Sequence, residues 1–369
     1  MKLKGIRVVD LSVFLPGPYL TKALADHGAE VIKVEAPGEG DPVRHLGPSD
    51  GPSTVYFRNL NRGKKSVVLN LKDPADKDAL LRLCDGADVF VETFRPGVMD
   101  RLGIGYATVS ARNPRIVYCS ISAFGQGGPY VNRPSHDLGV EGVSGVLSVS
   151  QGRDGQPAIP AVPAADMVAS LQGLAGILMA LLRRQQTGQG DYLDISMHDC
   201  MVSASANLLG PALAEDRQQV ARHERTTGGA AFYQIYDTAD GRHLALAGQE
   251  MKFVRNLLGA LGRPELAPLC EKPGPHQQPV EQFLRDAFRK RSLADWVAYL
   301  STLDVCFGEL KTFPEALRDP QLLARGMVLT DGLGRRHINT PLRFAREPAQ
   351  PDLREPAMGE HGAAILGRS

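Results

Sequence analysis

Two side chains of this sequence, the imidazole of His136 and the carboxylate of Asp166, could together move a proton on and off a carbon atom. An imidazole and a carboxylate that converge on one small pocket can act as two bases on opposite faces of an acidified C–H bond. Glu250, in the stretch LALAGQEMKF, is a candidate partner that holds His136 in one tautomer and stabilises its imidazolium form. The three residues together predict racemase-type chemistry.

Each of these residues also has a plainer interpretation. A lone histidine is more often a core or surface residue than a catalyst. Asp166 stands between the loop PAIPAVPAA and an apolar helix, where an Asp commonly serves as an N-cap and where the helix dipole keeps a carboxylate ionised. We expect the backbone N–H groups at the start of that helix to stabilise an enolate oxygen. Glu250 follows a predicted strand and could be an ordinary surface carboxylate, and we interpret the pair His198–Asp199 as capping and packing.

The composition restricts the class of protein. A chain of 369 residues with 43% hydrophobic content can bury a large core and is expected to form two lobes. A formal net charge of +1 offers no overall field for nucleic acid or for an anionic membrane. The five cysteines are far apart and form no CxxC, which disfavours a disulfide framework and a thiolate metal site and indicates a reducing, cytoplasmic compartment. The start of the chain reads as a strand rather than a secretory signal.

Strands and helices alternate through the first half of the chain. The pattern predicts strands over residues 6–10, 30–35, 66–69, 87–91, 115–120 and 192–196, and helices over 19–27, 74–84 and 167–186. Such alternation is typical of a parallel sheet with helices on both faces. The apolar stretch Met167–Leu182 is interrupted by polar residues and is too short to span a bilayer, so we expect a buried helix.

The second half of the chain has a different pattern. A charged segment near residues 216–225 is typical of a linker, and a hairpin is predicted in AFYQIYDTADGRHLALAG, followed by helices over 253–261, 282–288 and 293–300. The proline-rich end has little core potential and must pack on another surface. We therefore divide the chain into a large domain over residues 1–210, a small domain with its linker over 211–325, and a return segment over 326–369.

Several common signatures are absent from this sequence. The first strand-to-helix loop, VFLPGP, lacks GxGxxG, and the chain has no GxxxxGK[ST], HExxH or GxSxG. Three patches at predicted strand ends could instead hold an anionic, adenine-bearing ligand, because ligands of open parallel sheets bind at that edge. They are residues 61–65, residues 69–72 and residues 93–97 with Arg101 beyond.

Taken together, these segments resemble the class III CoA-transferase family, also called the CaiB/BaiF family, which includes the α-methylacyl-CoA racemases. The resemblance covers nearly the whole chain. It rests on GIRVVDLS, GPYLTKALADHGAEVIKVEAPGEGD, NRGKKSVVLNLK, ADVFVETFRPGVMDRLGIGY, ISAFGQGGPY, the region from SHDLGVEGVSG to AADMVASLQG, RRQQTGQGDYLDISMHD and FPEALRDPQLLARGM.

The resemblance implies an α/β fold: a Rossmann-like large domain with a parallel sheet, a smaller α+β domain, and a homodimer of two chains interlinked like rings. It implies an acyl-CoA substrate, with coenzyme A as part of that substrate and with no permanently bound cofactor and no metal. One family position that commonly carries an Arg is Ala36 here, so one phosphate or adenine contact is missing. The implied CoA-binding residues are Phe14, Leu15, Pro16, Arg62, Leu69, Asn70, Leu71, Lys72, Thr93, Phe94, Arg95, Val98, Arg101 and Arg133.

The same resemblance leaves three functions open. Racemases carry Gly-His-Asp where this chain has Ser135-His136-Asp137, and transferases typically have an aromatic residue before that Asp. Racemases usually follow the catalytic Asp with glycines, whereas residues 167–170 are Met-Val-Ala-Ser, which is closer to a transferase. We expect two-base racemisation of a 2-methylacyl-CoA by His136 and Asp166. The alternatives are CoA transfer through an Asp166 anhydride and thioester, and an inactive CoA-binding scaffold.

Overall fold

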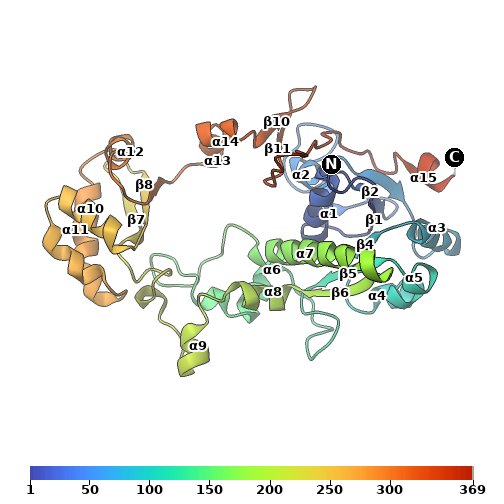
Figure 1. Ribbon diagram of the computed structural model, residues 1–369, viewed down its shortest axis with the longest axis horizontal. Coiled ribbons are helices and arrows are strands. Elements are labelled where there is room, and N and C mark those ends of the chain that lie inside the picture. The colour runs from blue at the N-terminus through green and yellow to red at the C-terminus, as the bar shows by residue number, and fades with distance from the viewer. Residues whose placement is uncertain (368–369) are drawn as a thin grey trace. The chain divides into compact units, whose positions relative to one another are not determined.

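A six-stranded parallel sheet organises the first part of the chain in the computed structural model, which describes residues 1–367 (Figure 1). Its strand order is β3-β2-β1-β4-β5-β6, the order of a doubly wound nucleotide-binding fold. The strands are β1 (Arg7–Asp10), β2 (Glu30–Glu35), β3 (Lys65–Val68), β4 (Val89–Glu92), β5 (Val117–Ser122) and β6 (Asp191–Ser196).

Helices cover both faces of this sheet because alternate strand residues point to opposite sides. On one face, Val9, Ile32 and Phe90 share a core with residues of α3, α4 and α5, and Tyr118 of β5 packs there too. On the other face, α7 approaches β5 so closely that a Cβ at Gly173 would lie 3.5 Å from Cys119 Sγ. The helices of this region are α1 (Pro16–Asp26), α2 (Val55–Asn61), α3 (Pro74–Asp85), α4 (Val98–Leu102), α5 (Tyr106–Arg112), α6 (Asp137–Val143), α7 (Ala164–Thr187) and α8 (Met197–Ala204).

The chain divides into two compact units. The first comprises residues 1–144, 160–205 and 320–369, and the second comprises 145–159 and 206–319. The division differs from the domain limits of 210 and 325 expected from the sequence, and it assigns 145–159 to the second unit. Arg222 explains this assignment, because its guanidinium donates to the carbonyls of Gly152 and Arg153. Such long-range side-chain contacts leave no local pattern in the sequence.

The second unit is a small α+β structure with its own core. Its antiparallel sheet has the order β7-β8-β9, formed by Tyr233–Asp237, His243–Ala247 and Phe307–Glu309. The predicted hairpin is confirmed, since Tyr233 pairs with Ala247 and Asp237 with His243. Trp296, Phe288 and Tyr236 pack in the core. Its helices are α9 (Gly210–Glu215), α10 (Met251–Ala260), α11 (Gln278–Phe288), α12 (Leu293–Leu300) and α13 (Phe313–Ala316).

The C-terminal segment of the chain packs against the rest of the first unit, to which it belongs. It contains α14 (Pro320–Ala324), the antiparallel pair β10 (Val328–Thr330) and β11 (Arg336–Ile338), and α15 (Gly362–Leu366). The N–H of Gly63 donates to the carbonyl of Arg354, and the N–H of His361 donates to the carbonyl of Ser66 in β3. These backbone bonds hold a chain with little core of its own on the edge of the sheet.

Helix α7 differs from the buried helix predicted for this stretch. An 18-residue window of this 24-residue helix has a mean hydropathy of 1.7, so by length and composition alone the helix could cross a membrane, and the expectation that the stretch is too short is wrong. It packs instead against α1, α8, β5 and β6. Yet Leu171, Leu178, Met179 and Leu182 are exposed, because the helix buries only one side against the sheet.

Candidate active site

A cavity of about 400 Å³ lies where the strand order of the large sheet reverses between β1 and β4. The connections that follow the two strands run to opposite sides of the sheet from this point, which is where open parallel sheets bind ligands. The two loops contact each other at their start, because the Val13 N–H donates to Thr93 Oγ1 at 3.1 Å. The lining residues are Val13, Phe14, Pro16, Thr93, Phe94, Arg95, Pro96, Ile121, Ser122, Ala123, Phe124, Val131, Arg133, Pro134, Ser135, His136, Asp166 and Met197.

His136 and Asp166 both line this cavity. His136 is the residue before α6, in extended conformation, and Asp166 lies in the first turn of α7. The His136 ring is exposed and meets the Phe14 ring edge-on, with 6.0 Å between centroids. The sequence therefore predicted correctly that these two groups share one cavity.

The start of α7 is capped by two acidic residues of α6. Asp137 Oδ1 accepts the N–H groups of Ala165 at 2.8 Å and Asp166 at 3.1 Å, and Glu141 Oε1 accepts that of Ala164 at 3.0 Å. Pro163, not Asp166, is the N-cap residue. The predicted capping role of Asp166 is wrong, and these N–H groups are already bonded, so they are not free to hold an enolate oxygen.

The same two carboxylates alter the acidity of Asp166. Burial raises the pKa of Asp166 to about 7, and the negative charges of Asp137 and Glu141 add to the rise. This is opposite to the sequence-based expectation that the helix dipole keeps Asp166 ionised, because burial disfavours the charged carboxylate, and Asp137 and Glu141 bring further negative charge to the same helix end. A carboxyl group with a pKa near 7 can both accept and donate a proton at neutral pH.

Two further polar groups near the site were not predicted. Ser122 ends β5 and lines the cavity, and its buried hydroxyl has no partner among the described residues. Tyr56 of α2 lies close enough to Asp166 and Asp41 for their charges, after burial, to raise its pKa to about 12. Neither residue stands in a recognisable motif, and only the fold brings them near Asp166.

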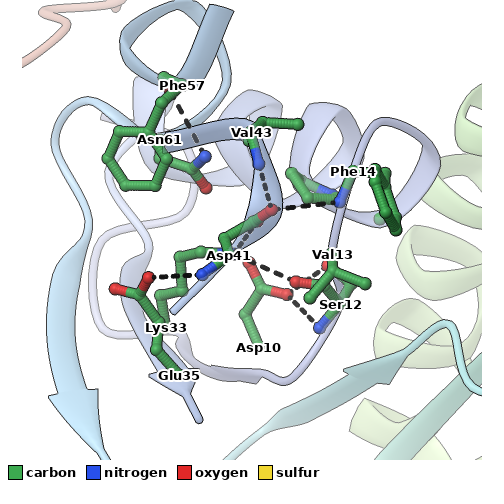
Figure 2. Close-up of polar contacts among 12 residues, drawn as sticks. Asp10, Ser12, Val13, Phe14, Lys33, Glu35, Asp41, Val43, Phe57 and Asn61 are labelled. Atoms are coloured by element: carbon green, nitrogen blue, oxygen red, sulfur yellow. Dashed lines mark hydrogen bonds and ion pairs between the residues drawn. The ribbon is translucent and has the colours of Figure 1, made fainter. Parts of the chain in front are cut away.

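The loop from β1 to α1, which forms one wall of the cavity, is fixed by buried charges (Figure 2). The Ser12 N–H donates to Asp10 at 3.0 Å, and the Phe14 N–H donates to Asp41 at 3.3 Å. Lys33 bonds the carbonyl of Ser12 at 3.0 Å and pairs with Asp41 at 2.7 Å. Phe14 itself has φ +63°, a conformation that costs a non-glycine residue about 1–3 kcal/mol.

Gly17, in the first turn of α1, is required by this close packing. A Cβ at Gly17 would lie 2.1 Å from the Ser12 Cβ, which is closer than atoms can approach. The glycine in the sequence LPGP therefore lets α1 begin directly against the loop. This contact and the three hydrogen-bonded N–H groups leave the cavity wall little freedom.

A second cavity of about 260 Å³ adjoins the first, with Val13 and Phe94 lining both. It contains the whole predicted patch of residues 69–72, together with Ala36, where an Arg was expected. Its other lining residues are Leu11, Val34, Glu35, Pro37, Gly40, Asp41 and Leu102.

Most of the predicted CoA-binding residues line one of the two cavities. The first cavity is lined by Phe14, Pro16, Thr93, Phe94, Arg95 and Arg133. The second is lined by Leu69, Asn70, Leu71 and Lys72, and also by Phe94. The Arg133 guanidinium also lies over the Tyr130 ring, 5.1 Å from its centroid. Leu15, Val98 and Arg101 line neither cavity.

Arg62 requires a correction. Its guanidinium is completely buried and donates to both carboxylate oxygens of Asp26 and to the carbonyl of Ile338. Lys64 of the same patch is also buried and pairs with Asp10 at 3.0 Å. Arg62 and Lys64 of the patch over residues 61–65 thus stabilise the fold and do not face a ligand, because both are paired with buried carboxylates.

Glu250 lies in the second unit. It is exposed and immediately precedes α10, and it makes no side-chain capping bond there. Its expected role beside His136 stays a prediction. His198 packs on the Phe124 ring, as the packing interpretation of His198–Asp199 expects. The capping part of that interpretation is wrong, because Ser196 caps α8 and accepts the N–H of Asp199.

Comparison with known proteins agrees with the resemblance drawn from the motifs. A family model described as CoA-transferase family III matches residues 3–362. Acetyl-CoA:oxalate CoA-transferase of Acetobacter aceti is 34% identical over 98% of this chain and 94% of its own length. Human alpha-methylacyl-CoA racemase is 33% identical over 99% of this chain and 93% of its own.

Solved structures give the same result. The crystal structure of a CaiB/BaiF family protein from Brucella suis matches with a TM-score of 0.86 and 33% identity, covering 99% of this chain and 98% of that one. The relatives of this chain thus include both transferases and a racemase, and the solved CaiB/BaiF structure shares its fold. This protein is a member of CoA-transferase family III, and it is an enzyme of the kind that this family comprises.

Proposed function

We propose that this enzyme racemises the α-carbon of a 2-methylacyl-CoA thioester. The thioester acidifies the α-hydrogen, so that one of His136 and Asp166 can remove it and the other can return a proton to the opposite face of the planar enolate. The substrate gains and loses one proton, and no oxidant or second substrate is consumed. The observation that carries this proposal is that an imidazole and a carboxyl group with a pKa of about 7 line one cavity.

The coenzyme A portion of the substrate is proposed to occupy the second cavity and the strand-end loops. Lys72 and Asn70 offer a cation and an amide there, next to the apolar side chains of Leu69 and Leu71. Because Phe94 lines both cavities, a thioester could extend from one into the other. The acyl chain would meet the apolar residues of the first cavity, among them Ile121, Phe124 and Met197.

The test is incorporation of solvent deuterium. Incubation of a 2-methylacyl-CoA in D₂O without any acceptor acid is expected to place deuterium at the α-carbon, as measured by mass spectrometry. His136→Ala should abolish this exchange, and His198→Ala is the matched control, because His198 does not line the cavity. Absence of exchange in the unmodified enzyme would contradict the proposal.

CoA transfer is the second candidate, and the transferases among the relatives favour it. In that reaction Asp166 attacks the thioester carbonyl, expels the CoA thiolate and forms a mixed anhydride. The thiolate then attacks the Asp166 carbonyl, which releases the donor acid as a carboxylate and leaves an enzyme-bound CoA thioester. The acceptor carboxylate attacks this thioester to form a second anhydride and expels the thiolate again, and attack of the thiolate on the acceptor carbonyl gives the new acyl-CoA and frees Asp166. This mechanism predicts strict dependence on an acceptor carboxylate. It also predicts that hydroxylamine traps an adduct at Asp166 during turnover.

We also propose that the enzyme is a cytoplasmic homodimer with interlinked chains, and that Glu250 orients His136. The exposed apolar residues of α7, Leu178 and Leu182 among them, support a partner surface. Sedimentation of Leu178→Glu/Leu182→Glu should show a monomer if that surface is buried between chains. Glu250→Gln should lower kcat for solvent exchange, because the His136 ring would lose the group that is proposed to orient it.

A further inference from the structure

The conformation of Phe14 sets the shape of the cavity beside His136. Phe14 and Asp216 are the two non-glycine residues with positive φ among residues 1–367. An aromatic residue rarely adopts this left-handed conformation, because its Cβ crowds the backbone. Some feature of the surrounding structure must therefore hold Phe14 in place.

Asp41 is the feature that contacts Phe14 directly. Its Oδ1 accepts the Phe14 N–H at 3.3 Å and the Val43 N–H at 3.1 Å (Figure 2). Its own N–H donates to Glu35 Oε2 at 3.0 Å, so its backbone is also fixed. The side chains of Asp41 and Lys33 are both fully buried, and they form an ion pair with 2.7 Å between Nζ and Oδ2.

The ion pair with Lys33 offsets the burial of the Asp41 carboxylate and fixes its position. A buried carboxylate that is paired with a cation keeps both oxygens available as hydrogen-bond acceptors. Lys33 also bonds the carbonyl of Ser12, two residues before Phe14. One buried pair thus fixes the loop at two points on either side of Val13.

We propose that Asp41 is a positioning residue: by accepting the Phe14 N–H, its carboxylate holds Phe14 in the left-handed conformation that sets the Phe14 ring edge-on against His136. The inference rests on the proposed function in that His136 is taken as one of the reacting groups. Asp41 does not line the first cavity, where the reacting groups lie, so it acts on them through Phe14. It does line the second cavity, proposed for the coenzyme A portion, and a direct effect on binding there would change KM and not kcat.

Two double variants separate the hydrogen bond from the charge. Lys33→Met/Asp41→Ala removes the ion pair and the acceptor, whereas Lys33→Met/Asp41→Asn removes the ion pair but keeps an amide oxygen for the Phe14 N–H. We expect the first to lower kcat by about 10- to 100-fold with little change in KM, because small displacements of reacting groups reduce rate steeply. The second should recover most of that loss.

Asp26→Asn is the matched control for destabilisation. Asp26 is another buried carboxylate of this unit, paired with Lys22 of α1 and with Arg62, the residue that follows α2. It should lower the melting temperature as the first double variant does, but it should leave kcat near the value of the unmodified enzyme. An equal loss of kcat in Asp26→Asn would overturn the proposal, since loss of stability alone would then explain it.

Phe14→Gly tests whether Asp41 acts through Phe14. Glycine adopts positive φ without strain, so this variant should fold, and it removes the ring that is to be positioned. In the Phe14→Gly background, adding Lys33→Met/Asp41→Ala should cause no further fall in kcat. Full additivity of the two losses would show that Asp41 acts by another route.

A measurement without substrate keeps this test separate from the proposed reaction. The Phe14 ring shifts the NMR resonance of the His136 Cε1–H, which His136→Gln assigns among the nine histidines. Phe14→Gly and Lys33→Met/Asp41→Ala should move this resonance in the same direction, and Asp26→Asn should not. An unmoved resonance in Lys33→Met/Asp41→Ala overturns the positioning role even if deuterium exchange proceeds, and a moved one supports it even if exchange is absent.

Discussion

Two groups of carboxylates lie near the same cavity, and their electrostatic surroundings are opposite. Asp10 and Asp41, under the β1–α1 loop, are each paired with a buried lysine. In the second group, where α6 meets α7, Asp137 and Glu141 accept backbone N–H groups from the start of α7, and their negative charges act on the carboxyl group of Asp166. The first group forms a rigid wall, whereas the second leaves one carboxyl group ready to exchange a proton.

The acidities show the same contrast. Burial raises the pKa of Asp10, but Lys64, Lys33 and two hydroxyl groups outweigh it, so the pKa is lowered overall. For Asp166, burial and both neighbouring charges act together and raise the pKa to about 7. Paired carboxylates are typical of structural sites, and a carboxyl group held near neutrality is typical of an acid–base site.

The largest expected effect is the loss of catalysis in Asp166→Asn. An amide cannot accept or return the proton, so solvent exchange should fall by about 10²- to 10⁴-fold. Deuterium incorporation under saturating thioester measures this loss. Asp85→Asn, which alters an exposed pair with Arg112, should leave the rate unchanged. Near-normal solvent exchange in Asp166→Asn would show that Asp166 is not one of the two bases, so the carboxylates around it would have no catalytic role to contrast with the paired group.

Breaking the paired group should instead destabilise the protein. Lys64→Met leaves the fully buried Asp10 without its nearest cation, and removal of one partner of a buried ion pair typically costs about 3–5 kcal/mol. Urea unfolding of the protein measures this cost. Lys64→Met/Asp10→Asn should recover part of the loss, because no charge is then left unpaired. A loss in Lys64→Met below about 1 kcal/mol would contradict the scaffold role.

The two groups should also give stability opposite dependences on pH. The ordinary Asp pKa is 3.8 and that of folded Asp166 is about 7, so folding favours the protonated form. The contribution of Asp166 is fully present below pH 3.8 and is lost as the pH rises through 7. Asp166→Asn should therefore be more stable than the unmodified enzyme at pH 8, by roughly 1–3 kcal/mol after allowance for solvent screening, with the gain disappearing near pH 4.

The contribution of Asp10 to stability should change with pH in the opposite direction to that of Asp166. Its folded pKa lies below 3.8, so its contribution to stability is present above pH 3.8 and is lost as the pH falls through the folded pKa. The difference in stability between Asp10→Asn and the unmodified enzyme should therefore shrink on acidification. Urea unfolding from pH 3 to pH 8 measures both variants. Parallel curves for the Asp10 and Asp166 variants would show that the two groups do not differ as described.

Much of this architecture follows from local patterns in the sequence. The strand over residues 30–35 and the helix over 293–300 have the predicted bounds, because β-branched runs and apolar periodicity are local properties. The shared cavity of His136 and Asp166 was also predicted, through the resemblance of ordered motifs to a family. Features that depend on neighbouring residues in the sequence, or on motifs in a fixed order, can therefore be recognised before the structure is known.

Contacts that depend on burial could not be predicted in this way. Arg62 and Lys64 have the appearance of exposed basic residues, and only the fold shows that Asp26 and Asp10 neutralise them. The shift in the pKa of Asp166 was predicted with the wrong sign, because its main cause is burial in the fold, and the charge that adds to it comes from Asp137, 29 residues away in sequence. Side-chain capping between two helices leaves no periodic pattern that a sequence could reveal.

The smallest effect that we predict concerns these capping carboxylates. Asp137→Asn keeps an oxygen that can accept the N–H groups of Ala165 and Asp166 but removes one negative charge beside Asp166. The pKa of Asp166 should fall, so the acidic limb of the kcat/KM profile for exchange should move to lower pH while the rate at its plateau changes little. Asp199→Asn, an exposed carboxylate on α8, is the matched control and should leave the limb in place. If the limb does not move in Asp137→Asn, burial alone sets the acidity of Asp166, and the contrast between the two carboxylate groups reduces to the presence or absence of a lysine.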